Sequence, residues 1–442
     1  SKKYIDLNPY LKNTKEEIFL GKNKIQINYK KNKLAIKGSG SIFLTDKSEQ
    51  IAYEIIRNND QFSFNTKMNI KDNSFQINLL NYQKKEGADS TILINGELKK
   101  DNSIEFQTIS LEENKNKILI NNLQLSKDYK ILDIEKFNIN YKNDNDFLNK
   151  LNLRKNGSNF IIEGDSLNLA RLINNIMDSD DENSSIFQNF NSKIDIKIKK
   201  TYIDEANHLN NLSGYIVFKD NKINKLILNA DFPNDKKITL TTITNEAKET
   251  TTSLITDYPK PLIKRYKFIK GFEEGNLNFK SVKKNGLSNS VLIIDDFKVQ
   301  EVPIFAKLLS LASLQGIADI LTGEGIRFTD LEMRFSNKKG LTIINEMYAL
   351  GPAVSILMDG YIKSKKLVSL RGTLVPATTI NRSIASIPFL GDLLIGDKAG
   401  EGVFGVSFKI KGPPEDLSTT VNPVKTLTPR FITRTLEKLK KN

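Results

Sequence analysis

Hydrophobic and polar residues alternate with a period of two from Gly21 to Asn140. Ile25 and Ile27 flank a polar residue, and Phe62 and Phe64 repeat the pattern. Short runs of this kind recur about every 8–14 residues, and clusters rich in Asn, Asp, Gly or Lys bound them. Since side chains at i and i+2 share one face of a strand, each strand has an apolar face and a polar face. The pattern predicts an antiparallel β-meander.

A helix is expected to interrupt the strands at Asp165–Met177, where Asp165 or Ser166 can cap it and apolar residues follow at three- and four-residue spacing. The Thr-rich stretch Asn245–Asp257, followed by two prolines, predicts an internal boundary. We therefore expect three regions, which are 1–150, 151–257 and 258–442. Strands are expected to resume at 194–198, 214–218, 226–228 and 238–243.

Apolar runs become longer in the last region. A helix over Pro303–Leu321 carries apolar residues around more than one stripe, so protein or lipid must cover it on most sides. The irregular apolar stretch Ile380–Ile395 and a basic helix over Pro429–Lys440 are two further elements. Strands are expected at 326–335, 341–349, 354–362, 367–375 and 402–410.

The amino-acid composition excludes most kinds of catalytic and metal site. The 442 residues include no cysteine and a single histidine, so thiolate chemistry and histidine-cluster metal sites are excluded. His208 lies among polar residues and is expected to be an exposed loop residue. The acidic pairs Asp295-Asp296 and Glu273-Glu274, and the distant Glu324 and Glu401, lack the further ligands or geometry of a site. We expect no catalytic residue, no metal and no cofactor.

The formal net charge is +14, but positive and negative residues are interspersed, which is typical of a solvated surface. No basic stretch combines with stacking aromatic residues, so nucleic acid is not an expected partner. No window reaches the ~18–20 apolar residues of a membrane-spanning helix, and the N-terminal segment, which lacks Met, has no signal-peptide core. We expect a piece of a longer, processed chain.

An amphipathic sheet must hide its apolar face. It can close as a barrel, stack on a second sheet or lie under helices. The pattern alone favours one of these three arrangements. Alternatively, the sheet curls into a long groove that accepts lipid acyl chains, because the three expected helices cannot cover so many strands. The candidate groove-lining residues are Ile25, Ile27, Ile92, Ile94, Ile194, Ile196, Ile198, Ile238 and Leu240.

Four segments of the last region resemble the end of AsmA-like proteins of the YhdP type, which are relatives of TamB in the Gram-negative envelope. The resemblance is strongest in LLSLASLQGIADILTGEGIRF and in GTLVPATTIN followed by IPFLGDLL. Upstream, GFEEGNLNF and FIIEGDSLNLARLI resemble shorter elements of the family. One departure is Thr428-Pro429-Arg430, where the family commonly has Pro-Gly. The four segments are Val302–Leu331, Ala349–Ile362, Leu370–Leu394 and Gly400–Phe431.

This resemblance implies a mainly β fold, with a long twisted antiparallel sheet curled into an open hydrophobic groove and a few interposed amphipathic helices. It implies a non-enzymatic phospholipid conduit between the inner and outer membranes, located in the periplasm as part of a longer protein with an inner-membrane anchor. An alternative is a structural or assembly scaffold that binds other envelope proteins. The residues expected at an end plug or in contact with the outer membrane are Phe305, Leu308, Leu309, Leu393, Leu394, Phe431, Ile432 and Leu436.

Overall fold

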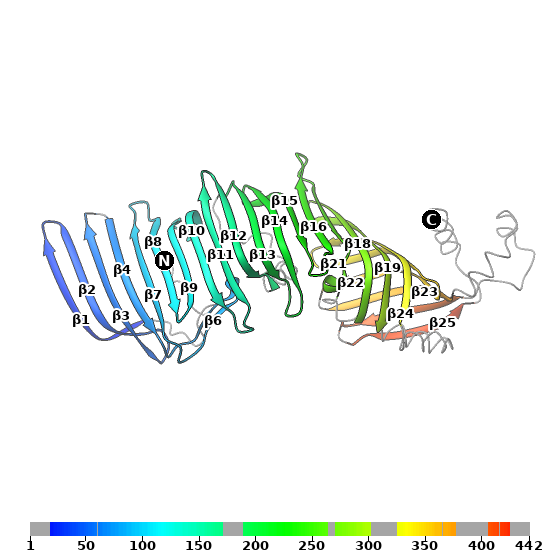
Figure 1. Cartoon of the computed structure of the whole chain (residues 1–442), viewed down its shortest axis with the longest axis horizontal. Coiled ribbons are helices and arrows are strands. Elements are labelled where there is room, and N and C mark those ends of the chain that lie inside the picture. The colour runs from blue at the N-terminus through cyan, green and yellow to red at the C-terminus, as the bar shows by residue number, and fades with distance from the viewer. Residues whose placement is uncertain are drawn as a thin grey trace, which may run out of the picture. The chain divides into compact units, whose positions relative to one another are not determined.

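The structure is a computed structural model that is mainly β and divides into two compact units, residues 1–233 and 234–442 (Figure 1). The ranges that it describes are 18–59, 61–170, 189–263, 270–301, 325–364, 366–376, 405–414 and 416–424.

The sheet of the first unit has thirteen strands, which pair in the order in which they occur along the chain. Most connections are short, as the alternating pattern predicts, and the exceptions lie between β4 and β7 and between β12 and β13. The strands are β1 (Phe19–Lys30), β2 (Lys33–Phe43), β3 (Ser48–Asn58), β4 (Gln61–Ile70), β7 (Ser90–Leu98), β8 (Ile104–Glu113), β9 (Asn116–Leu125), β10 (Ile131–Lys142), β11 (Leu148–Asn156), β12 (Asn159–Asn168), β13 (Lys193–Tyr202), β14 (His208–Lys219) and β15 (Lys222–Asp231).

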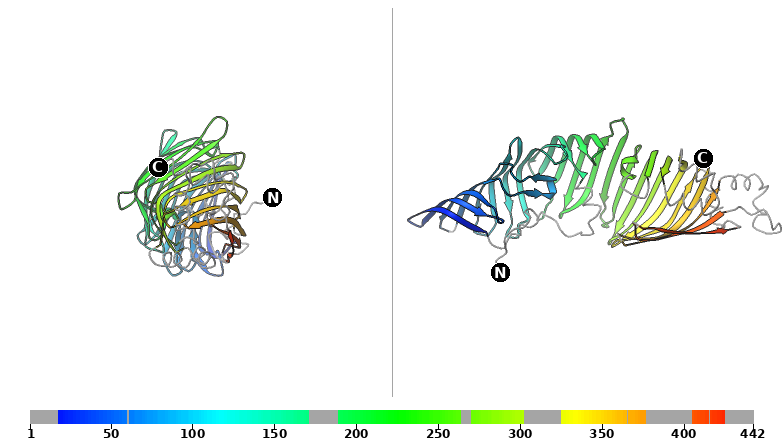
Figure 2. Two further views of the ribbon diagram at one scale, coloured as in Figure 1. Left: turned by 90° about the vertical axis from the view of Figure 1, so that its right-hand side faces the viewer. Right: turned by 90° about the horizontal axis from the view of Figure 1, so that it is seen from below.

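The second unit has ten strands, which pair in the order in which they occur along the chain, and the short helix α2 (Lys260–Ile263). Its yellow and orange strands bend along their length (Figure 2, left). No described pairing joins β1 to β15 or β16 to β25, so the strands of neither unit close into a barrel. The strands are β16 (Lys237–Thr244), β17 (Thr250–Thr256), β18 (Lys270–Lys284), β19 (Leu287–Glu301), β20 (Ile326–Lys338), β21 (Leu341–Leu350), β22 (Val354–Lys363), β23 (Leu367–Pro376), β24 (Gly405–Gly412) and β25 (Ser418–Val424).

A small insertion lies between β4 and β7 of the first unit. It consists of β5 (Phe75–Ile77), the 3-10 helix η1 (Asn78–Leu80) and β6 (Tyr82–Lys84). β5 and β6 form a separate two-stranded antiparallel sheet. The alternation of apolar residues predicts a strand at Phe75, but it does not predict that this strand leaves the main sheet.

The expected helix over Asp165–Met177 is wrong at its start. Asp165 and Ser166 belong to β12, which extends to Asn168 because it pairs with β13. The side chain of Asn168, not that of Asp165, accepts the capping hydrogen bond, from the backbone N–H of Ala170 at 2.9 Å. Residues 171–177 lie outside the described ranges.

The pairing of β12 with β13 is parallel, whereas every other strand pair in the described ranges is antiparallel. A parallel connection must return to the starting end of the sheet, which takes a dozen or more residues. The long segment between Asn168 and Lys193 provides that length. The expectation of a purely antiparallel sheet is therefore wrong at this one position.

The Thr-rich stretch that suggested a boundary is largely a strand. Residues 250–256 form β17, which pairs with β16 on one side and with β18 on the other. Thr side chains favour strands because their branched Cβ fits the pleated surface. The two compact units instead divide at residue 233, in the connection between β15 and β16.

Several predicted elements fall outside the described residues. They are the helices Pro303–Leu321 and Pro429–Lys440, the apolar stretch Ile380–Ile395, residues Glu324 and Glu401, and all eight residues expected at an end plug or membrane contact. In the described part of the chain, no helix has the length and apolar character needed to cross a membrane.

Candidate functional site

One face of the first unit carries an unbroken apolar row that crosses all thirteen strands of the sheet. Cross-strand partners share a face, so the strand registers place these side chains in line. Isoleucine, leucine and aromatic residues dominate the row, and two glycines and one threonine are its other members. We call it the open row, and its members are Ile25, Gly38, Tyr53, Thr66, Ile94, Ile109, Ile120, Phe137, Leu153, Ile162, Ile196, Gly214 and Leu228.

Apart from Gly38, which is buried and has no side chain, no member of the open row is fully buried, although the row lies on the apolar face of a folded sheet. Ile25 is 52% exposed, and its neighbour Ile27 on the same face is 66% exposed. Farther along the row, Ile94 and Ile196 are half-buried. This face therefore presents a continuous hydrocarbon surface that the described protein atoms leave partly accessible.

The opposite face of the same strands is mainly polar. The parallel row one residue away consists of Lys24, Ser39, Ala52, Lys67, Leu93, Ser110, Leu119, Asn138, Asn152, Glu163, Lys197, Ser213 and Asn229. Cross-strand ion pairs lie on this face, such as Lys37 with Glu54 at 3.1 Å and Lys117 with Glu112 at 2.6 Å. The two faces thus differ sharply in polarity, as the alternating sequence predicts.

The insertion between β4 and β7 covers the next row of the apolar face. Tyr82 of β6 is 1% exposed and packs in one cluster with this row, which is buried along its length. We call it the covered row, and its members are Leu111, Ile118, Ile139 and Leu151 of β8 to β11. Ile92 of β7 leads into this row and packs against the same cluster.

Buried polar groups anchor the insertion. The Tyr82 hydroxyl donates a 2.6 Å hydrogen bond to Glu113, and Glu49 accepts hydrogen bonds from the backbone N–H groups of Lys71 and Asn73. Burial, and then the Glu113 carboxylate, raise the pKa of Tyr82 far above its usual value. The phenol therefore stays protonated and continues to donate. Hydrogen bonds to a carboxylate are roughly twice as strong as neutral ones, so this network holds the insertion in place.

A buried lysine completes the anchor. Lys84 of β6 is fully buried, and its ammonium group donates hydrogen bonds to the backbone carbonyls of Lys71 and Asn73. Burial lowers the pKa of Lys84, and the nearby carboxylates of Glu49 and Glu113 oppose that shift. A buried charge is tolerated only when such partners surround it.

The apolar face of the second unit is more completely packed. Its corresponding row is Leu240, Leu254, Phe279, Leu292, Met333, Met347, Met358, Gly372, Phe408 and Val421. Met358 and Phe408 are buried members of a large cluster that also contains Ile263 of α2. Phe297 stacks between Phe272 and Phe328, with ring centroids 5.3 Å apart on both sides. This face is largely a hydrophobic core.

The nine predicted lining residues all lie on the apolar faces of their units. Ile25, Ile94 and Ile196 belong to the open row, and Leu240 belongs to the row of the second unit. Ile198, in contrast, is only 2% exposed. The i, i+2 alternation predicts which face of the sheet a side chain occupies, but the exposed fraction varies from residue to residue. The remaining residues on these faces are Ile27, Ile92, Ile194 and Ile238.

The acidic pairs considered as cation sites have partners from the protein. Arg327 of β20 forms ion pairs with both Glu274 and Asp296, and Glu273 lies 3.5 Å from the Lys260 ammonium. Within the described ranges, no group of three or more His, Asp or Glu residues could hold a metal ion. A structural role explains these carboxylates.

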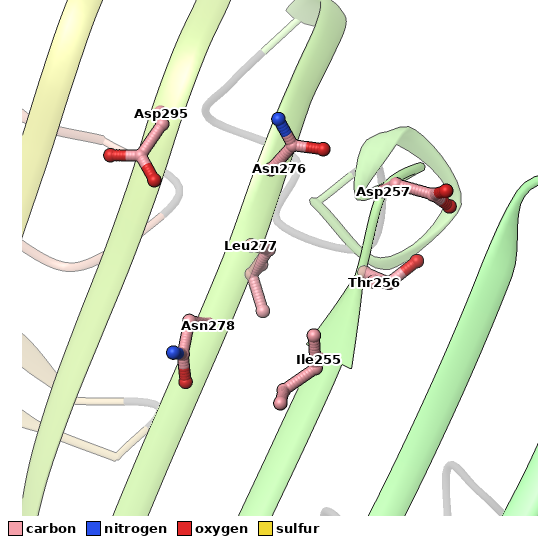
Figure 3. Close-up of a pocket in the computed structure, with 7 residues that line it drawn as sticks. All are labelled: Ile255, Thr256, Asp257, Asn276, Leu277, Asn278 and Asp295. Carbon is pink, nitrogen blue, oxygen red and sulfur yellow. The ribbon is translucent and has the colours of Figure 1, made fainter.

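A small depression between β17, β18 and β19 is lined by Asp257, Asn276, Asn278 and Asp295, together with Ile255, Thr256 and Leu277 (Figure 3). Asp257 accepts a hydrogen bond from the backbone N–H of Lys237 and so belongs to a turn. The side chains point in different directions around the depression (Figure 3). We assign no chemistry to it.

His208 was expected in an exposed loop, and this expectation is wrong. It begins β14 and is half-buried opposite Tyr202, with ring centroids 6.1 Å apart. Burial, and then the charge of Lys200, lower the pKa of the imidazole. His208 is therefore mainly neutral near pH 7.

No protein family model, curated protein or solved structure matches this chain. The candidate site therefore rests on the geometry of the chain itself, which is the open row of the first unit. The sequence reasoning missed the covering insertion. β5 and β6 are only three residues long each, and the alternation of apolar residues around Phe75 does not distinguish them from strands of the main sheet.

Proposed function

We propose that this chain is a non-enzymatic carrier of phospholipid acyl chains, which lie along the apolar face of the first unit. The observation that carries the proposal is the open row, whose members on thirteen strands are all at least partly exposed except the buried Gly38. A globular protein normally buries such a face, and large exposed apolar patches mark binding surfaces.

The dimensions of the row suit hydrocarbon chains. Neighbouring strands lie about 4.8 Å apart, so thirteen strands extend the row over roughly 58 Å. The hydrocarbon core of a bilayer, which holds two acyl chains end to end, is about 30 Å thick. The row therefore offers space for several acyl chains in succession.

The chemistry of the row suits a sliding cargo. Each methylene removed from water contributes about 0.8 kcal/mol without any directional contact. The apolar side chains of the open row therefore bind an acyl chain at many equivalent positions along the row. Movement needs no bond to be broken, and any direction must come from outside the described residues.

The resemblance of the last region to AsmA-like proteins of the YhdP type supports the wider setting of the proposal. In that setting the chain is part of a longer, inner-membrane-anchored protein in the periplasm of a Gram-negative bacterium. Phospholipid would pass between the inner and outer membranes, and other envelope proteins are further partners. The interspersed charge would keep the polar face in water.

Site-specific photo-crosslinking tests the proposal. A photoreactive amino acid replaces Ile94 in the open row, or Leu93 on the opposite face of the same strand, and the protein is incubated with phospholipid vesicles. We expect a lipid-sized mass increase at position 94 and none at position 93. Absence of lipid at both positions, or equal labelling of the two, would contradict the proposal. Crosslinks from position 94 to an envelope protein instead would favour the scaffold alternative.

A further inference from the structure

One row on the apolar face of the first unit contains a charged residue, Arg57. The row lies at the end of the sheet where β3 turns into β4, and both of these strands pair with a neighbour on each side (Figure 1). Among the members that the described pairings link, Arg57 is the only charged one. The others are Tyr29, Leu34, Phe62, Leu98, Ile104, Leu125 and Ile131. Arg57 is therefore a cation at the border of a hydrocarbon surface.

Two contacts hold the Arg57 guanidinium in place. Its central carbon lies 5.5 Å from the centroid of the Phe62 ring, and its Nε donates a 3.1 Å hydrogen bond to the backbone carbonyl of Asn59. The cation–π contact and the hydrogen bond together fix the plane of the guanidinium. The two terminal nitrogens then form a fork of donors, and such a fork matches two oxygens of one phosphate group.

The protein leaves this fork unused. Within the described ranges, no carboxylate forms an ion pair with Arg57, and no acceptor bonds its terminal nitrogens. Lys99, at the same end of the sheet, lies 3.2 Å from Glu97 and 2.9 Å from Glu105. Arg57 thus differs from this neighbouring cation, because its charge and two of its nitrogens face no partner from the chain.

The apolar face beside Arg57 is covered at one end and open at the other. On β4, Ile70 is 3% exposed and packs in a cluster with Phe75 of the insertion, whereas Phe62 at the opposite end is 37% exposed. On β3, Ile55 is 38% exposed, and Arg57 follows it on the same face. A lipid on this part of the face therefore meets the insertion at one end and Arg57 at the other.

The length of the open part suits one acyl chain. Tyr53, the member of the open row on β3, precedes Arg57 by four residues, which span about 13 Å along a strand. An acyl chain occupies half of the bilayer core, or about 15 Å. When the tails of a phospholipid cover Ile55 and reach Tyr53, its headgroup lies at Arg57.

We propose that Arg57 binds the phosphate group of a phospholipid whose acyl chains lie on the apolar face of β3 and β4. The terminal nitrogens donate hydrogen bonds to two phosphate oxygens, and Phe62 and Ile55 contact the tails. This inference rests on the proposed function and adds the orientation of the lipid, with its headgroup at the β3–β4 turn and its tails towards the open row. Because Arg57 is exposed, water readily replaces the phosphate, and the lipid remains free to move along the row.

Two lipids with the same labelled tails test the inference on the full 442-residue chain. One is phosphatidylglycerol, and the other is diacylglycerol, which lacks the phosphate. Arg57→Gln should weaken phosphatidylglycerol binding about fivefold at low salt and leave diacylglycerol binding unchanged. Arg57→Lys keeps the charge but not the planar fork, so its loss should be smaller.

Arg154→Gln is the matched control. Arg154 is exposed on the polar face of β11, next to Leu153 of the open row, and lies 3.8 Å from Glu163. This variant loses the same charge as Arg57→Gln and should bind both lipids as the unaltered chain does. Diacylglycerol binding also shows that each variant keeps a folded apolar face.

The outcomes separate the headgroup inference from the carrier proposal. Unchanged phosphatidylglycerol binding by Arg57→Gln, or an equal loss of both lipids, overturns the headgroup inference and leaves the carrier proposal standing. Binding of neither lipid by the unaltered chain overturns both. Glycerol phosphate, which has the phosphate but no tails, should not displace phosphatidylglycerol at millimolar concentration. Displacement would overturn the inference in favour of a site for free phosphate.

Discussion

Aspartate in the open row should strongly weaken lipid binding at that part of the row without unfolding the protein. Ile94 lies between Thr66 of β4 and Ile109 of β8 on the apolar face, and it is half-buried. Leu93, its neighbour in β7, is also half-buried but faces the polar side, beside Lys67. Ile94→Asp and Leu93→Asp therefore add the same charge to adjacent positions on opposite faces.

The two substitutions should have similar effects on stability. Burying a Leu or Ile side chain fully contributes about 1.5–3 kcal/mol, so a half-buried residue contributes about 1 kcal/mol. Each variant should lose about this much free energy of unfolding. Lipid binding should differ, because a carboxylate placed in hydrocarbon costs about 3 kcal/mol on insertion scales. This corresponds to an affinity loss of roughly 100-fold for Ile94→Asp and to little change for Leu93→Asp.

The assay measures a fluorescent phospholipid titrated against each purified variant, together with lipids that copurify and are detected by mass spectrometry. Urea unfolding checks that both variants are folded and equally stable. Equal lipid binding by the two folded variants would refute the reasoning, because the apolar face would then have no special role. Loss in Leu93→Asp alone would place the lipid on the opposite face.

Three further predictions concern the insertion and the strand contacts. Tyr82→Phe removes a hydrogen bond to the buried Glu113, so the free energy of unfolding should fall by about 1–3 kcal/mol in urea titrations. Burial raises the pKa of Tyr82 and Tyr141, so the contribution of these two residues to stability should be constant below about pH 10 and be lost above it, and their tyrosinate absorbance should develop only as the protein unfolds. Gly214→Ala places a Cβ 1.9 Å from a backbone oxygen and should lower the melting temperature much more than Gly87→Ala, where φ is also positive but no atom lies within 4 Å.

The strands and their faces follow from the sequence because the strand period is local. Alternation at Ile194, Ile196 and Ile198 fixes which side chains share a face of β13, whatever lies beside the strand. The hairpin turns are equally local, since Asn tolerates positive φ at turns such as Asn32 and Asn221. Strands β20 to β24 of the last region were predicted for the same reason, whereas β18, β19 and β25 were not.

The partner of a strand lies far away in the sequence, so a local segment does not specify it. The wrong predictions arise from such pairings. Asp165 and Ser166 have the sequence of a helix start, but β13 returns beside β12 and extends it as a strand. Likewise, His208 lies among polar residues, but pairing with Tyr202 makes it the start of a strand. Nothing in either local segment specifies the partner that determines its conformation.

Accessibility depends on packing against residues that are distant in the sequence, so the width of the exposed apolar surface could not be predicted. Ile92 and Ile94 are two residues apart in β7 and have the same sequence pattern. The row that continues from Ile92 is buried under Tyr82 of the insertion, whereas the row through Ile94 is not. The insertion therefore narrows the apolar face to the open row and the more exposed residues beyond it, such as Ile27. Because an acyl chain needs only a narrow hydrocarbon track, this covering stabilises the sheet and still leaves a continuous path across all thirteen strands.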